Sequence, residues 1–330
     1  MKDNSKPLVS IRCLVYNHEP YLRQCLDGFV MQQTDFAFEA IVHDDASIDN
    51  SAAIIREYAE KYPDIIKPIY ETENQYSKKD GSLSRIMNEA VHPAAKYIAF
   101  CEGDDYWINP KKLQNQVGFL EQHSDYSMCW TDAFVETGGV LTVYNRYSES
   151  CQSPLEDIII GGGDFVPTCS IVMRKALFFA MPQKAKNYYV GDYPIQMWCG
   201  YMGNVAYIRE QTCVYRFLAP GSWTSRHTKE TKEQILQHFR NEKTLLDGYN
   251  ELFDFKYNDA FEKRAAYILY YLLISAGEYE MAKPYLKLRK KYGMPFNKAD
   301  EFRIYGFKNL ARAVSFCIRL KSYVTRLVKK

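Results

Sequence analysis

The chain has 330 residues, in which 42 Lys and Arg balance 40 Asp and Glu to a net charge of +2. Hydrophobic residues make up 47% and charged residues 25% of it, as in ordinary globular proteins. These figures exclude a disordered chain, a collagen-like repeat and a coiled coil. The even charge also excludes a protein that coats nucleic acid along its whole surface, so no nucleic-acid partner is expected.

Strands and helices alternate in the first third of the chain, because apolar runs of strand length are followed by apolar residues at helical spacing. Asp49 and Ser82 are the expected caps of the second and third helices. The expected strands are 8–15, 38–43, 65–70 and 96–101, and the expected helices are 18–30, 50–62, 82–90 and one that opens at Asn109-Pro110. This alternation predicts a largely parallel sheet with helices on both faces, whose ligands gather beyond the carboxyl ends of the strands.

The pattern changes after residue 125. The expected strands 126–131, 169–173, 205–208 and 212–217 are short, and the chain beyond Thr228 has only helical patterns. We therefore expect an α/β domain over residues 1–225 and a helical region over residues 226–330. The longest uncharged apolar stretch, 265–277, has 13 residues. A bilayer span needs roughly 20, so a buried helix is expected there.

Cysteine usage indicates the compartment. The nine cysteines include no C-x-x-C pair, and several lie in apolar runs. They are expected to be buried thiols in a reducing cytosol rather than disulfides or a zinc site. The first seven residues are polar, so no signal peptide is expected and the predicted location is cytoplasmic.

Acidic residues follow two of the expected strands. Glu102, Asp104 and Asp105 come directly after the fourth strand, and Asp44 and Asp45 end the second. Carboxylates this close repel one another unless a cation neutralises them, and oxygen ligands favour Mn²⁺ or Mg²⁺ held together with substrate phosphates. One carboxylate at the second strand can accept the imide N–H of a uracil ring. A solvated acidic turn is the alternative.

Three blocks of sequence, in this order and spacing, carry a family resemblance. They are Val9-Ser-Ile-Arg-Cys-Leu-Val-Tyr-Asn17, Ile41-Val-His-Asp-Asp-Ala-Ser-Ile-Asp49 and Tyr97-Ile-Ala-Phe-Cys-Glu-Gly-Asp-Asp-Tyr-Trp107, followed by Asn109-Pro-Lys-Lys-Leu113. Over roughly residues 7 to 225 the chain resembles a family 2 glycosyltransferase. The resemblance implies the GT-A fold, a Rossmann-like mixed sheet with helices on both faces, joined here to a helical C-terminal region.

The resemblance also implies an activity. An enzyme of this kind transfers a sugar, with inversion, from a nucleotide-diphosphate donor to an acceptor. The donor is expected to be UDP-linked. The acceptor is expected to be a glycan or a lipid-linked saccharide in surface polysaccharide or lipopolysaccharide assembly. A catalytically inert relative that binds a glycan or a nucleotide sugar is the alternative.

Matching residues receive roles from the same resemblance. Asp45 would read the nucleotide base in a pocket lined by Val15 and Tyr16. Asp104 would face the ribose and the metal ion, and Asp105 the metal ion and the diphosphate.

The resemblance leaves further assignments open. Glu102 is a metal ligand if the acidic triplet is matched in its second register. Arg85, on the helix before the fourth strand, contacts the base or phosphates or is an ordinary surface residue. Thr168 and Ser170 are expected near the sugar or phosphates. His227 is either a third metal ligand or a surface histidine.

Tryptophan rings are a further candidate for sugar contact. Trp107, Trp198 and Trp223 could stack on sugar rings, although a tryptophan in such a position is more often a core residue.

A general base is expected in Val190-Gly-Asp-Tyr-Pro194, which resembles a later acidic motif of the family. The usual Glu-Asp pair is Gly191-Asp192 here, which leaves Asp192 as the expected base for the acceptor hydroxyl. The alternative is that Asp192 only caps the helix that starts there, and Asp132 and Asp164 are the next candidates.

The last segment of the chain is basic. Residues 302–330 hold eight Lys or Arg and no Asp or Glu, and their apolar residues recur at helical spacing. Such a helix can lie on an anionic membrane, which would make the protein a peripheral membrane protein at the inner face of the cell membrane. The alternative is a helix that packs on the α/β domain or on a second subunit of a homodimer.

Other nucleotide-binding folds are excluded by missing motifs. A nicotinamide dehydrogenase needs G-x-G-x-x-G after the first strand, where this chain has Tyr16-Asn-His-Glu-Pro20, and a P-loop hydrolase needs G-x-x-x-x-G-K-[ST], which is absent.

Overall fold

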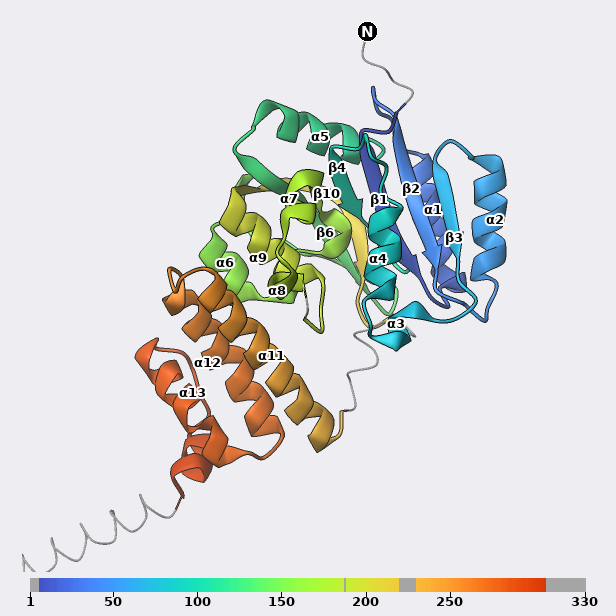
Figure 1. Ribbon diagram of the computed structural model, residues 1–330. Helices are drawn as coiled ribbons and strands as arrows, with labels where there is room; N and C mark the ends of the chain where they lie inside the picture. The colour runs from blue at the N-terminus through green and yellow to red at the C-terminus, as the bar shows by residue number, and fades with distance from the viewer. Residues whose placement is uncertain (1–5, 187, 220–229, 307–330) are drawn as a thin grey trace, which may run out of the picture. The chain divides into compact units, whose positions relative to one another are not determined.

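The structure is a computed structural model that describes residues 6–186, 188–219 and 230–306. The chain divides into two compact units, Met1–Lys229 and Glu230–Lys330. The first unit is built on one mixed sheet with helices on both sides, α4 in front of β1 and α1 behind β2 in the view of Figure 1.

The strands of the sheet run in the order β3-β2-β1-β4-β9-β6-β10-β5, with β7 paired to β6 and β8 to β10. Strands β3, β2, β1 and β4 are parallel, whereas β9 is antiparallel to both β4 and β6. Their bounds are β1 Val9–Val15, β2 Phe38–Asp44, β3 Ile66–Tyr70, β4 Tyr97–Phe100, β5 Tyr106–Trp107, β6 Tyr126–Thr137, β7 Val140–Val143, β8 Cys151–Gln152, β9 Val172–Arg174 and β10 Asn204–Arg216.

The helices of this unit fall between the strands, as the alternating pattern predicts. They are α1 Glu19–Val30, α2 Ser51–Lys61, α3 Gln75–Lys78, α4 Ser82–Glu89, α5 Lys112–Gln122, α6 Leu155–Gly161, α7 Lys175–Ala180, α8 Gln183–Lys186 and α9 Asp192–Met202, with short 3₁₀ turns at Gly163–Phe165 and Thr168–Ser170. Alternate residues of β1 and β2 pack against the apolar stripe of α1 to form the main core. Burial of that stripe is what fixes the helix on the sheet.

Local chemistry explains where element ends differ from the sequence expectations. Ser82 was expected to cap α4 but is its first helical residue. The N-cap is Gly81, and the Asp80 carboxylate accepts the N–H of Ser82. Helix α5 begins at Lys112, because the side-chain oxygen of Asn109 accepts the N–H of Lys111, the residue before the helix.

Three further segments differ in part from the sequence expectations. Residues 204–216 form one strand whose pairing with β6 shifts register three times, where two strands were expected. Residues 168–170 form a 3₁₀ turn, so the strand expected over 169–173 is only Val172–Arg174. The N-cap of α2 is Asn50 and not Asp49, but the Asp49 carboxylate accepts the N–H groups of Ser51 and of Glu19 and so joins the starts of α2 and α1.

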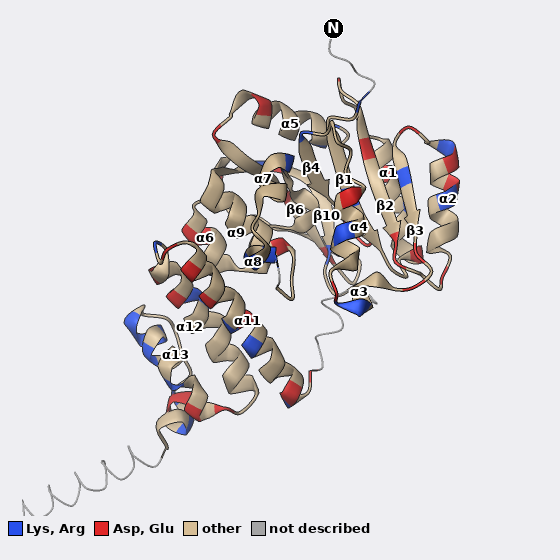
Figure 2. Cartoon of the chain, viewed as in Figure 1, with Lys and Arg blue, Asp and Glu red and all other residues tan. Residues whose placement is uncertain are grey.

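The second unit consists of α11 Lys232–Leu252, α12 Asn258–Ser275 and α13 Tyr279–Lys291, followed by a helical segment at 298–306. Helix α12 packs against both α11 and α13. It carries the apolar stretch that was expected to form a buried helix, but only one side of it is buried, since Tyr267 and Tyr271 are exposed. Charged residues lie along α11 and α13 (Figure 2). The part-buried ion pair of Arg264 on α12 and Glu242 on α11 joins these two helices at 3.2 Å. No helix within the described residues is long and apolar enough to cross a membrane.

The eight cysteines in the described ranges are free thiols, and all but Cys151 are buried, as the sequence predicts.

Candidate active site

Three loops meet where β1, β2 and β4 end. Because these strands are parallel, their carboxyl ends lie at the same edge of the sheet. The N–H of Asp45 donates to the carbonyl oxygen of Val15 (2.9 Å), and the N–H of Gly103 donates to that of Leu14 (2.9 Å). The loop after β1 is therefore joined to the loops after both of its neighbours, and the candidate residues from the three blocks come together.

Gly103 is required by this close approach. A Cβ atom at residue 103 would lie 2.8 Å from Nδ1 of His18 and 2.9 Å from Cγ2 of Val15. Real Cβ atoms do not come this close to other heavy atoms, so only glycine fits between the ends of β1 and β4.

We expect Gly103→Ala to lower the free energy of unfolding by about 1–3 kcal/mol, as forced overpacking does, and to weaken nucleotide binding. Gly118→Ala is the matched control. It lies within α5 with no atom within 4 Å of its added methyl group, so it should gain up to about 1 kcal/mol from helix propensity. Chemical denaturation of both variants tests this, and equal stability of the two would contradict the close approach.

The acidic triplet is crowded. Asp105 is 3% exposed, and burial raises its pKa well above the usual range, helped by the charges of Asp104 and Glu102. Glu102 has a side chain that is exposed to solvent. Desolvation, followed by the charges of Asp104 and Asp192, raises its pKa too, and the water that reaches the side chain relieves part of this effect. These carboxylates are therefore close enough to repel one another.

The residues present fit a cation that arrives with a diphosphate. The described part of the chain holds no group of three His, Cys, Asp or Glu side chains arranged to bind a metal ion. Mg²⁺ sites in nucleotide enzymes use one or two carboxylates and fill the remaining positions with phosphate oxygens and water. The buried pair Asp104 and Asp105 meets that requirement, with Glu102 beside it.

Asp192 is the first residue of α9, at the helix start that the sequence predicts. Its Oδ1 accepts the N–H of Tyr193 (2.8 Å), and its Oδ2 accepts a long hydrogen bond from the hydroxyl of Thr168 (3.5 Å). Burial raises the pKa of Asp192, and the charge of Asp164 adds to the shift. A half-buried carboxylate with a raised pKa, next to the acidic triplet, suits a group that takes up a proton.

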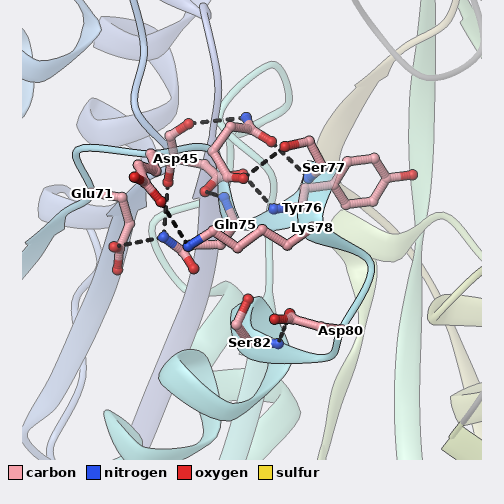
Figure 3. A network of polar contacts seen from close by, with 10 residues as sticks. Asp45, Glu71, Gln75, Tyr76, Ser77, Lys78, Asp80 and Ser82 are labelled. Atoms are coloured by element: carbon pink, nitrogen blue, oxygen red, sulfur yellow. Dashed lines mark hydrogen bonds and ion pairs between the residues drawn. The ribbon is translucent and has the colours of Figure 1, made fainter.

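Asp45 holds α3 at the edge of the sheet (Figure 3). The N–H of Gln75 donates to its Oδ1 (2.6 Å) and the N–H of Tyr76 to its Oδ2 (3.0 Å), while the side chain of Asn74 donates to its carbonyl oxygen (3.0 Å). Each carboxylate oxygen keeps a second lone pair for a ligand. Asp45 therefore carries a structural role that the sequence did not indicate, beside the base-reading role that the resemblance implies.

We expect Asp45→Ala to erode the preference for UDP over GDP and ADP, because it removes the acceptor for a base and frees the backbone of α3. Asp80→Ala is the matched control, since Asp80 caps the neighbouring helix through the N–H of Ser82 (2.9 Å) and is exposed (Figure 3). Calorimetry of the three nucleotides should show the loss only in the Asp45 variant. An unchanged preference would remove Asp45 from the base site.

Two other expected donor contacts are placed as follows. Tyr16 is half-buried at the edge, but Val15 is 1% exposed and lies beneath it, so only Tyr16 offers side-chain surface to a base. Arg85 is exposed on α4, and no hydrogen bond ties its side chain to the described residues.

Several residues with weaker expectations prove to be structural, which corrects their assignment. Trp107 is 2% exposed, and its indole N–H donates to the carbonyl oxygen of Cys169 (2.8 Å), so it cannot stack on a sugar. Ser170 is buried and donates to the carbonyl oxygen of Pro167 (2.6 Å). Trp198 is likewise buried. His227 and Trp223 lie outside the described residues.

The two alternative bases also differ from Asp192. Asp132 is fully buried, and its carboxylate accepts the N–H groups of Ala133 and Asn145 and the side chain of Gln211, so no substrate hydroxyl can reach it. Asp164 is exposed and acts on Asp192 through its charge.

The end of β10 adds residues that the sequence analysis missed. Burial raises the pKa of Tyr215, and the charges of four carboxylates (Asp105, Asp164, Glu102 and Asp104) add to the shift, so its hydroxyl lies within electrostatic range of the acidic triplet. The next residue, Arg216, donates its backbone N–H to Oδ1 of Asp105 (2.8 Å). No local sequence signal marks either residue, because their place follows from the pairing of β10 with β5.

Comparisons with known proteins agree with this geometry. The family described as "Glycosyl transferase family 2" matches residues 10–178. An uncharacterised protein of Mycobacterium tuberculosis, Rv1520, is 32% identical over 226 residues, which cover 68% of this chain and 63% of that protein. The minor teichoic acid biosynthesis protein GgaB of Bacillus subtilis is 31% identical over 114 residues, 34% of this chain and 12% of that protein.

A solved structure shares the fold. TarS 1-349 of S. aureus, in complex with UDP-GlcNAc, superposes with a TM-score of 0.54 at 18% identity, over 82% of this chain and 80% of that one. The predicted GT-A fold is thereby confirmed.

Proposed function

Because the chain belongs to glycosyl transferase family 2, we propose that it transfers a sugar from a UDP-linked donor to a glycan or lipid-linked acceptor, with inversion at the anomeric carbon. The observation that carries the proposal is that Asp192, at the start of α9, acts by its charge on Glu102, while Glu102, Asp104 and Asp105 crowd together after β4. This arrangement sets a candidate base beside a candidate diphosphate site.

The donor side of the proposal rests on Asp45 and the acidic triplet. Asp45 would accept the imide N–H of uracil, and the bound UDP-GlcNAc of the TarS structure is consistent with such a donor. Asp105 and Asp104, with Glu102 beside them, would hold a Mn²⁺ or Mg²⁺ ion, which supplies Lewis-acid neutralisation of the leaving diphosphate.

The acceptor side rests on Asp192. Its carboxylate takes the proton of the acceptor hydroxyl as that oxygen forms a bond to the anomeric carbon. The bond from the anomeric carbon to the diphosphate oxygen breaks, and its electron pair leaves with UDP. Since attack comes from the face opposite the diphosphate, one displacement inverts the configuration.

A donor screen tests the proposal. The protein is incubated with UDP-, GDP- and ADP-sugars, Mn²⁺ and a saccharide acceptor, and nucleotide release is measured. Release from a UDP-sugar that rises when acceptor is added supports a transferase. Tight UDP-sugar binding without release would instead identify an inert binding relative.

The proposed setting is surface polysaccharide assembly at the inner face of the cell membrane, in keeping with the teichoic acid relative GgaB. Membrane contact would come from the basic segment 302–330, of which residues 307–330 lie outside the described ranges.

We expect the full chain to float with anionic liposomes at low salt, and a chain that ends at Glu301 to stay in the soluble fraction, because the lysines and arginines beyond it are attracted to anionic lipid. If both stay in solution, the membrane contact is wrong. Sedimentation of the two proteins then tests whether the segment forms a homodimer.

A further inference from the structure

Arg216 ends β10 and is only 7% exposed, although it carries a charge. Its guanidinium is tied to three separate parts of the fold. Nη1 donates to the carbonyl oxygen of Asp104 (2.5 Å), Nε to the carboxylate of Glu136 (3.1 Å), and Nη2 to the side chain of Gln24 on α1. The carboxylate of Glu136 neutralises the charge of Arg216. Arg216 therefore contributes hydrogen bonds in fixed positions to the acidic triplet rather than net positive charge.

Two rings hold the guanidinium plane. It lies 4.4 Å from the ring centroid of Tyr106 and 4.9 Å from that of Tyr21. Stacking and a fork of donors together fix an arginine in a way that lysine cannot reproduce.

Strand register explains why Arg216 reaches the acidic triplet. Strand β10 is antiparallel to β5, and Val214 is paired with Tyr106. The same register, carried two residues further, brings Arg216 opposite Asp104. Its backbone N–H then donates to Oδ1 of Asp105 at 2.8 Å. One residue thus holds the carbonyl oxygen of Asp104 and the carboxylate of Asp105.

We infer that Arg216 is a positioning residue that sets the direction of the Asp105 carboxylate for a metal-bound nucleoside diphosphate. The inference rests on the proposed function and deepens it, because it assigns the support of the ion-binding carboxylate to β10. With Oδ1 of Asp105 held by the backbone of Arg216, Oδ2 remains for the ion. Partners that orient a ligating carboxylate typically change metal affinity by about 10–100-fold when they are lost.

Arg216→Lys in the full chain tests this. It keeps the charge and the backbone N–H but loses the guanidinium contacts and the stacking that hold this N–H in place against Asp105. Calorimetry with UDP present should show Mn²⁺ affinity about 10–100-fold weaker than in the wild type, with the preference for UDP over GDP unchanged.

Arg174→Lys is the matched control. Arg174 also donates to backbone carbonyl oxygens, those of Tyr126, Leu120 and His123, and lies over the ring of Tyr97. It is paired with Tyr97, at the start of β4 and so at the opposite edge of the sheet. Arg174→Lys should lower the melting temperature of the protein but leave its Mn²⁺ affinity unchanged.

The outcomes separate the inference from the proposed function. If Arg216→Lys binds Mn²⁺ as tightly as the wild type, or if Arg174→Lys loses as much Mn²⁺ affinity as Arg216→Lys, the positioning role of Arg216 is overturned. The proposed function is not affected by either result. A wild-type protein that binds neither UDP nor Mn²⁺ overturns the proposed function and this inference with it. If Arg216→Lys does not fold, Gln24→Ala serves instead, because it removes one exposed hydrogen-bond partner of the guanidinium. This variant should bind Mn²⁺ severalfold more weakly than the wild type. An unchanged Mn²⁺ affinity would also overturn the inference.

Discussion

Asp192→Asn should lower turnover of the donor by about 10²–10⁴-fold while UDP binding stays unchanged, because an amide cannot take up the proton of the acceptor hydroxyl. Asn keeps an oxygen for the N–H of Tyr193, so the start of α9 should persist. Steady-state kinetics and calorimetry measure the two effects. Near-normal turnover would assign the base elsewhere, and lost UDP binding would indicate a structural role.

The pH profile supplies a control for this variant. Asp192 must be ionised to act as a base, and its raised pKa means that activity falls, as the pH is lowered, earlier than it would for an ordinary Asp. Asp164 contributes to that shift by its charge. Asp164→Asn should therefore move the acidic limb to lower pH with the plateau nearly unchanged, whereas an unmoved limb would separate Asp164 from Asp192.

Asp105→Asn should abolish transfer, and chelation with EDTA should abolish it in the wild type, where added Mn²⁺ or Mg²⁺ restores it. The physical reason is that one of the two buried carboxylates beside the diphosphate site is lost. Full activity in EDTA would contradict the metal assignment. Glu102→Gln tests which carboxylates of the acidic triplet bind the ion. If Glu102 is itself a metal ligand, this variant should be as inactive as Asp105→Asn. If Glu102 is not a ligand, the variant should keep more activity than Asp105→Asn.

The Asp105→Asn variant should not be less stable than the wild type. The folded-state pKa of Asp105 is raised, so its ionisation costs stability as the pH rises from the ordinary Asp value to the raised one, and the full cost persists above that. Asn removes this cost and can still accept the N–H of Arg216. In EDTA near neutral pH, Asp105→Asn should melt at or above the wild-type temperature, and the difference should vanish below about pH 4. A lower melting temperature would show that repulsion is not the main effect at Asp105.

Much of the site follows from local sequence patterns. The three blocks place Tyr16, Asp45 and the acidic triplet directly after strands, and parallel strands end at one edge, so these residues had to meet. The start of α9 at Asp192 also follows from its local sequence. The sequence by itself thus determined the α/β architecture and most candidate residues, because strand period, helix period and strand-end polarity are local properties.

Only the tertiary structure decided which side chains face the site and what supports them. The pairing of β10 with the two-residue β5 brings Arg216 and Tyr215 to the acidic triplet from more than a hundred residues away. Burial against α1 takes Trp107 into the core, and the two N–H groups of α3 engage the Asp45 carboxylate. Such long-range register and packing are set by contacts between distant segments, which no local pattern in the sequence records.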